Sequence, residues 1–127
     1  MTSTRGSLRL LFDHNIPAPL RRLIPGHDIT FADERGWGEL TNGDLLAAAE
    51  AAGFDVLLTA DRNLHHQQNL TGRRIGLIVL STNHWPVIRD NVQRILAAVE
   101  QAGREQCLEV DLPRPTLLRR PRPATER

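Results

Sequence analysis

Short apolar runs alternate with amphipathic segments along most of the chain. Four of these runs are predicted to be strands, and each is bounded by polar or turn-forming residues: 8–12, 28–32, 56–59 and 75–80. A shorter run at 108–110 is predicted to be a last strand at an edge of the sheet. The runs at 56–59 and 75–80 are apolar almost throughout, which is typical of strands buried on both faces of a parallel sheet.

Two helices are predicted in the first half of the chain. A proline at position 17 or 19 suits the first turn of a helix that runs to Leu23. Thr41 followed by Asp44 resembles a capping box, which opens a second helix, LLAAAEAA, and Gly53 ends it. This second helix is apolar almost all round, so we expect it to be buried against the sheet.

The longest predicted helix begins at Pro86. Its apolar residues recur on one face with the helical period: Ile88, Val92, Ile95, Leu96 and Val99. Repeated alternation of strand and helix implies right-handed crossovers and a mostly parallel sheet of four to five strands. We therefore predict a single three-layer α/β/α domain over residues 1–112, a length that supports one hydrophobic core.

Composition separates a short C-terminal tail from this domain. Residues 1–112 hold 11 Arg against 14 Asp and Glu, a formal charge of −3, whereas residues 113–127 hold five Arg against one Glu, a charge of +4. The tail is rich in proline and poor in apolar residues, so we expect it to be disordered or extended and available to an anionic partner. A solvated terminus without a role explains the same composition equally well.

Composition also excludes several classes of chemistry and location. All 16 basic residues are arginines, so mechanisms that need a lysine, such as a P-loop or a Schiff base, are excluded. The one cysteine, Cys107, has no partner for a disulfide or a zinc site, which agrees with a reducing compartment. No apolar run approaches the roughly 20 residues of a membrane span, and from the short apolar stretch before Asp13 we expect no signal peptide. We expect a cytoplasmic protein.

Two of the apolar runs end at an aspartate. Asp13 directly follows the run at 8–12, and Asp61 lies just beyond the run at 56–59. In an open parallel sheet the carboxyl ends of the strands meet at one edge, where ligands bind. Like charges on neighbouring strands repel each other unless a proton or a cation joins them. We therefore expect an acidic, cation-binding site that includes Asp13 and Asp61.

Other polar residues near this edge have an ordinary structural explanation beside the functional one. Asp44 at a helix start suits a cap as well as a site, and Glu34 in a polar loop is more often solvated. The Thr59 hydroxyl and the Asn63 amide either orient a carboxylate or form a turn. Arg62 either lines the path of a phosphate backbone or lies at the surface. These alternatives remain open from the residues alone.

The donor set favours a hard divalent cation. Carboxylates without organised histidines or cysteines suit Mg²⁺ or Mn²⁺, which are held by a few carboxylates, water and a substrate phosphate. One or two such ions could activate water for in-line attack on a phosphodiester. His14 is expected to point to the opposite face if the first strand continues past Asp13, so a catalytic role is its weaker interpretation.

The order and spacing of these motifs resemble those of PIN domains. Between Asp44 and Asn63, an aspartate opens a helix rich in Ala and Leu, a glycine ends it, and a strand delivers a second aspartate in a T-x-D context. The first strand, ending in Asp13, is similar to the amino-terminal PIN strand. LFDHNIP, ERGWG and TADRN together resemble the small PIN-like toxins of type II toxin–antitoxin systems. The resemblance covers residues 8–110.

This resemblance implies a PIN-like fold and four catalytic acids: Asp13, Glu34, Asp44 and Asp61. Three of them are implied ligands of Mg²⁺ or Mn²⁺: Asp13, Asp44 and Asp61. The residues expected to contact the substrate are Asn15, Arg62 and Asn63.

The predicted function is therefore a metal-dependent endoribonuclease that acts as the toxin of a type II pair. The implied partners are an RNA substrate and a cognate antitoxin protein, and a homodimer is compatible with this function. The alternative is a non-catalytic PIN-like module that binds RNA or protein, with an acidic cluster too incomplete to hold metal tightly. A domain of charge −3 attracts a polyanion poorly, so in either case phosphate attraction must come from Arg62, Arg73, Arg74 or the tail. A calorimetric titration with Mn²⁺ distinguishes the two.

Overall fold

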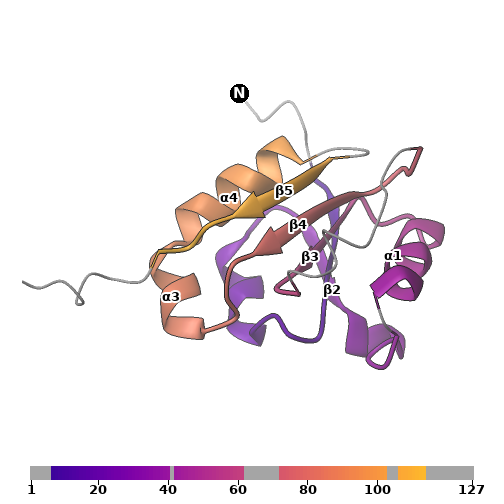
Figure 1. The fold of residues 1–127 in the computed structure, drawn as a ribbon, viewed down its shortest axis with the longest axis horizontal. Coiled ribbons are helices and arrows are strands. Elements are labelled where there is room, and N and C mark those ends of the chain that lie inside the picture. Colours follow the sequence, from indigo (N-terminus) through magenta and orange to yellow (C-terminus); the bar gives the residue numbers. More distant parts are fainter. Residues whose placement is uncertain (1–6, 41, 62–71, 103–105, 114–127) are drawn as a thin grey trace, which may run out of the picture.

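The apolar runs of the chain form five strands of one sheet, in which every neighbouring pair is parallel (Figure 1). The strands are β1 (Arg9–Phe12), β2 (Asp28–Phe31), β3 (Val56–Thr59), β4 (Gly76–Leu80) and β5 (Cys107–Val110). Their order across the sheet is β2-β1-β3-β4-β5, so β5 lies at an edge as predicted. The structure is a computed structural model that describes residues 7–40, 42–61, 72–102 and 106–113, and only the backbone of Asn42.

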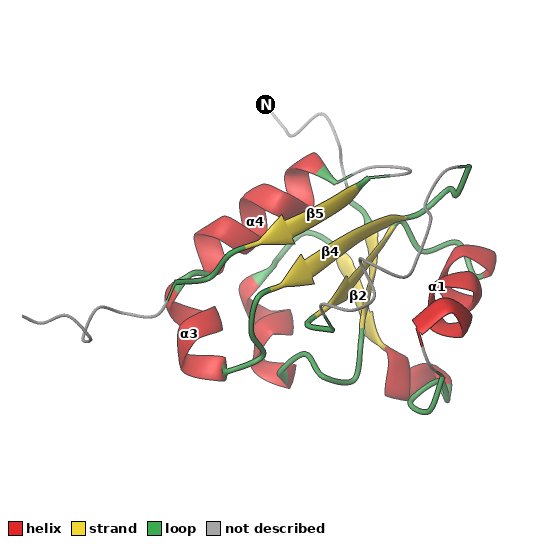
Figure 2. Ribbon diagram, in the orientation of Figure 1, coloured by secondary structure: helices red, strands yellow, loops and turns green. Residues whose placement is uncertain are grey.

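Helices cover both faces of this sheet (Figure 2). The helical elements are the short 3₁₀ helices η1 (Ala18–Leu23) and η2 (Ala32–Arg35), and the α-helices α1 (Asn42–Ala51), α3 (Trp85–Asp90) and α4 (Val92–Gln101). On one face Phe12 and Leu58 pack in a cluster with residues of η1, α3 and α4. On the other face Leu11 and Leu57 pack with residues of α1. The predicted three-layer α/β fold with a parallel sheet is confirmed.

α1 runs back along the sheet from its carboxyl edge to its amino edge. The Arg9 guanidinium at the start of β1 donates a hydrogen bond to the Ala52 carbonyl just beyond α1, with an Nη1–O distance of 2.8 Å. Gly53 then adopts a left-handed φ of 87° and ends the helix as predicted. Because ten helical residues span about 15 Å, the first turn of α1, with Asp44, lies toward the edge where the strands end.

Two predicted helices differ from the observed ones. The segment after Pro17 is a 3₁₀ helix, in which the Leu20 N–H bonds to the Pro17 carbonyl three residues earlier. The helix beginning near Pro86 is divided at Asn91 into α3 and α4. The Asn91 side-chain amide donates to the carbonyls of Val87 and Pro113, at 2.8 and 3.1 Å. Among the described helices, none has the length and apolar character that a membrane span requires.

Candidate functional site

Asp13 is a buried carboxylate at the carboxyl end of β1. Only 6% of the residue is exposed, and Thr59 at the end of β3 is fully buried beside it. The Asp13 backbone N–H bonds to the Leu58 carbonyl at 2.9 Å, which extends the β1–β3 pairing by one residue. An ionised carboxylate is costly to bury unless it is hydrogen-bonded. The fold must therefore supply donors to it.

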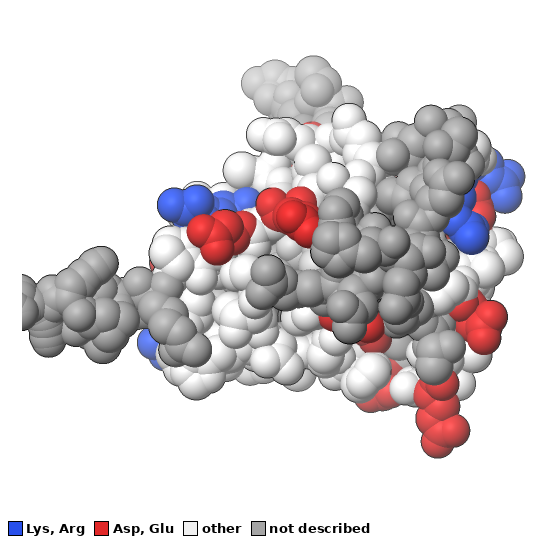
Figure 3. Space-filling model, viewed as in Figure 1, with Lys and Arg blue, Asp and Glu red and all other residues white. Residues whose placement is uncertain are grey.

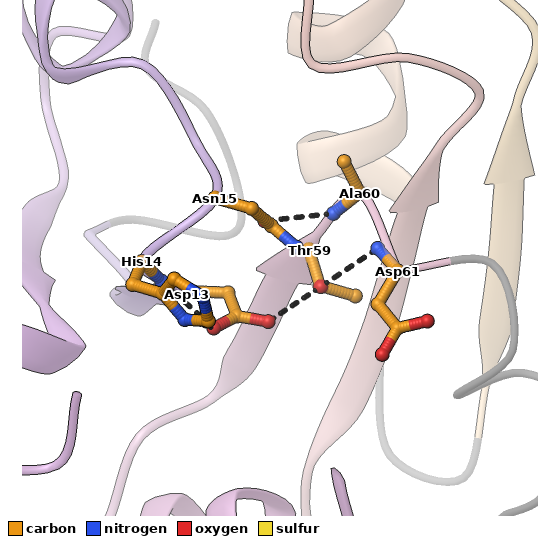
Figure 4. Close-up of polar contacts among 6 residues, drawn as sticks. All are labelled: Asp13, His14, Asn15, Thr59, Ala60 and Asp61. Atoms are coloured by element: carbon orange, nitrogen blue, oxygen red, sulfur yellow. Dashed lines mark hydrogen bonds and ion pairs between the residues drawn. The ribbon is translucent and has the colours of Figure 1, made fainter. Parts of the chain in front are cut away.

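Three contacts surround the Asp13 carboxylate (Figure 4). The Thr59 hydroxyl donates to Oδ2 at 2.7 Å, and the backbone N–H of His14 donates to Oδ1 at 2.7 Å. The ring Nδ1 of His14 lies 3.0 Å from Oδ1. The Thr59 hydroxyl oxygen also accepts the backbone N–H of Asp61 at 3.0 Å. One hydroxyl thus connects the two strand-end aspartates, and it orients the Asp13 carboxylate.

His14 lies on the same side as Asp13, because the condition under which it would face away, a first strand that continues past Asp13, is not met. β1 ends at Phe12, and the Ile16 N–H bonds back to the Asp13 carbonyl at 3.0 Å, so the chain turns immediately after the strand. The turn returns the imidazole to the carboxylate. The His14 side chain is 56% exposed. It lines a hollow of about 530 Å³ with Asp33, Gly36, Gly38 and Glu39.

Asn15 and Asp61 complete the end of the β1–β3 pair. The side-chain oxygen of Asn15 accepts the backbone N–H of Ala60 at 3.1 Å, which fastens the two strand ends together. Asp61 follows one residue later and is partly buried. The prediction that Asp13 and Asp61 lie at the ends of neighbouring strands is therefore confirmed (Figure 4).

Asp44 is placed differently from these two aspartates. It is exposed in the first turn of α1. Among the described residues, no group of three or more His, Cys, Asp or Glu side chains is arranged to hold a metal ion. The structure therefore brings Asp13 and Asp61 together at adjacent strand ends, but it does not join Asp44 to them in a three-ligand group.

Glu34 has structural partners on both of its carboxylate oxygens. The Phe31 backbone N–H donates to Oε1 at 2.9 Å, and the Arg21 guanidinium donates to Oε2 at 2.8 Å. These contacts, the Phe31 hydrogen bond first and the Arg21 pair second, lower the pKa of the Glu34 carboxyl below its ordinary value. Glu34 thus fastens η2 to η1. A role for it in the chemistry of the site would require these contacts to open.

Two predicted substrate residues, Arg62 and Asn63, lie outside the described residues. Asp33, an exposed residue of η2, also lines the hollow beside His14. A side chain on Gly38 would collide with the Asp33 carboxylate, so the second glycine of the ERGWG segment allows that close approach. The sequence feature that could have indicated this close approach is a glycine near an acid in a polar loop.

Compared with known proteins, the chain matches no protein-family model, no curated protein and no solved structure. Its chemistry is therefore inferred from the geometry at the carboxyl ends of β1 and β3.

Proposed function

We propose that this protein is a metal-dependent endoribonuclease with a PIN-like fold, acting as the toxin of a type II toxin–antitoxin pair. The observation that carries the proposal is the Asp13 carboxylate, which is buried at a strand end and oriented by the Thr59 hydroxyl, whose oxygen also accepts the backbone N–H of Asp61 at the end of the next strand. Ligand sites of open parallel sheets lie at this edge. A carboxylate fixed at this edge is in a position to bind a cation.

The donor set fits Mg²⁺ or Mn²⁺. Each carboxylate oxygen offers two lone pairs, and Oδ2 of Asp13 accepts one described hydrogen bond, from Thr59. Mg²⁺ in nucleotide enzymes is commonly held by one or two carboxylates together with water and substrate phosphates. Asp13 and Asp61 are the proposed pair, and Asp44 is the proposed third ligand, approaching from the first turn of α1. When bound, the ion would supply Lewis-acid activation of water and would neutralise charge on the phosphodiester.

The surrounding residues have separate roles in this proposal. Thr59 directs its only hydroxyl proton to Asp13, which keeps the carboxylate in one orientation as an acceptor. Burial of Asp13 and Thr59 limits the water that competes for the carboxylate. Arg62 and Asn63 remain the proposed contacts to the RNA backbone. Because the Asp13 carboxylate is already oriented, it needs no rearrangement when substrate arrives.

The test is cleavage of a fluorescently labelled RNA by purified protein with Mg²⁺ or Mn²⁺. Asp61→Asn and Asp13→Asn should each lower the rate by more than about 100-fold, since even outer partners of a metal site contribute 10- to 100-fold. Asp28→Asn is the matched control, because Asp28 is an exposed aspartate at the amino end of β2, on the opposite edge. Wild-type cleavage by Asp61→Asn would refute the nuclease.

The toxin role and the antitoxin partner are tested by expression in a bacterial host. A ribonuclease toxin should arrest growth when it is expressed alone, and Asp61→Asn should relieve the arrest at equal protein level. Co-expression of the neighbouring reading frame should also relieve it and should yield a complex that co-purifies. Equal arrest by the wild type and by Asp61→Asn would separate toxicity from the carboxylate site.

A second candidate is a non-catalytic PIN-like module that binds RNA or protein. It is favoured by the missing three-ligand group among the described residues. On the face drawn in Figure 3, the described Arg side chains gather toward the two ends and acidic side chains lie between them, without one continuous basic surface. A calorimetric titration that detects no Mn²⁺ binding at millimolar metal would favour this module over the nuclease.

A further inference from the structure

The orientation of the Asn15 side-chain amide is determined by its partner. The backbone N–H of Ala60 can only donate, so the Asn15 atom that faces it at 3.1 Å must be the carbonyl oxygen. This contact excludes the flipped amide. Because the amide group is planar, its NH₂ end is directed away from the Ala60 N–H. The contact joins two strand ends that lie 45 residues apart in the chain.

The NH₂ group of Asn15 has two N–H donors and no described acceptor. No described residue accepts a hydrogen bond from Nδ2, although the residue is partly buried. Buried polar groups usually have a partner in protein or water, so the acceptor for this partly buried NH₂ group is either water or a ligand that displaces it. The neighbouring groups drawn in Figure 4 include two carboxylates, Asp13 and Asp61, and a hydroxyl whose proton is already directed to Asp13. Among the residues drawn in Figure 4, the Asn15 amide therefore places neutral donors beside two carboxylates.

We propose that Asn15 is a substrate-binding residue whose amide N–H groups donate to a non-bridging oxygen of an RNA phosphodiester. This inference rests on the proposed nuclease function. A phosphate oxygen is an acceptor, and the neutral donors of Asn15 bind it without forming an ion pair with the adjacent carboxylates. An arginine at this position would pair with Asp13 or Asp61 and would compete with a cation for them. An amide avoids that competition.

Two substitutions separate this role from a purely structural one. Asn15→Asp keeps an acceptor for the Ala60 N–H but loses the donors, whereas Asn15→Ala loses both. Asn15→Asp also adds a negative charge beside Asp13 and Asp61, so near-wild-type cleavage by this variant would exclude a donor role, whereas a loss of cleavage needs the NMR measurement to assign it to the donors. The proposal predicts that both variants lose kcat/KM by about 10- to 100-fold, the scale of a hydrogen bond to a charged group. Gln93→Ala, which removes an exposed amide from α4, is the matched control and should leave cleavage unchanged.

A binding measurement makes the test independent of cleavage. Dimethyl phosphate, a singly charged phosphodiester, is titrated into isotopically labelled wild-type protein with Mg²⁺ present, and the side-chain NH₂ signals of Asn15 are followed by NMR. In the wild-type protein these NH₂ signals should shift when dimethyl phosphate is added. In Asn15→Ala, the backbone signals near Ala60 should not show a comparable shift. Unchanged Asn15 signals, or wild-type cleavage by Asn15→Asp, would overturn the proposal.

The two proposals fail in different ways. If Asp61→Asn abolishes cleavage while the Asn15 signals do not shift with dimethyl phosphate, the proposed nuclease function is supported and the proposed role of Asn15 is wrong. If the Asn15 signals shift while Asp61→Asn cleaves like the wild type, Asn15 contacts a phosphodiester and the metal-dependent nuclease is wrong. Thermal unfolding of each variant confirms that it is folded before either result is read.

Discussion

Replacing Thr59 with valine tests the contact on which the candidate site depends. Valine has nearly the shape of threonine and suits a strand, so the change removes a hydroxyl from a fully buried position with little change in packing. Two hydrogen bonds are lost: the one donated to Asp13 at 2.7 Å, and the one accepted from the Asp61 N–H at 3.0 Å. The Asp13 carboxylate remains buried with one donor fewer.

The expected loss of stability follows from these two bonds. A hydrogen bond to a charged group contributes about 1.5–3 kcal/mol, and a neutral one contributes about 1 kcal/mol. Thr59→Val should therefore lower the free energy of unfolding by about 2.5–4 kcal/mol at neutral pH. For a domain of this size, that loss corresponds to a fall in Tm of about 10–16 °C.

The assay is urea unfolding followed by circular dichroism, with Thr59→Ser as the control. Serine keeps the hydroxyl and loses one methyl group, which should cost only about 1 kcal/mol. The cost of Thr59→Val should also shrink in an Asp13→Asn background, because the bond to a charged acceptor is then absent. If Thr59→Val is no less stable than Thr59→Ser, the hydroxyl does not support a buried carboxylate, and our account of the site is wrong.

Two further predictions concern the contacts around the sheet. The pKa of Glu34 is lowered, so the stability that the ionised carboxylate contributes is present above the ordinary carboxyl pKa and is lost as pH falls through the lowered value. Glu34→Gln should therefore lower the free energy of unfolding at pH 7 but not in strong acid. Urea unfolding curves at both pH values check this. Gly53→Ala should cost about 1–2 kcal/mol, since φ is left-handed and a Cβ would lie 2.9 Å from Arg9 Nη1. Gly26→Ala, which shares the left-handed φ without a close neighbour, should cost less.

Local patterns in the sequence determined the strands and the position of two acids. The runs that became β1, β3 and β4 are apolar because both of their faces are buried, so the pattern alone predicts a parallel sheet. Asp13 and Asp61 were found because a polar residue directly after such a run lies at the carboxyl edge of the sheet. These inferences need only residues that are adjacent in the chain.

Contacts between distant residues decided what local patterns could not. The long helix is divided at Asn91 because its amide reaches the Pro113 carbonyl, 22 residues away, and Glu34 is engaged because Arg21 lies beside it in space. Asp44 lies at a helix start whether it acts as a cap or as a metal ligand. Only the fold shows that it is exposed and that, among the described residues, it belongs to no three-ligand group.

The sequence by itself thus determined which segments are strands and which acids end them. The tertiary structure decided that β1 and β3 are neighbours, that the Thr59 hydroxyl joins their two aspartates, and that His14 turns back to Asp13. The physical reason is that the pattern of buried positions depends on residues that are consecutive in the chain. A hydrogen bond between side chains depends instead on the positions and directions of atoms that strand pairing brings together.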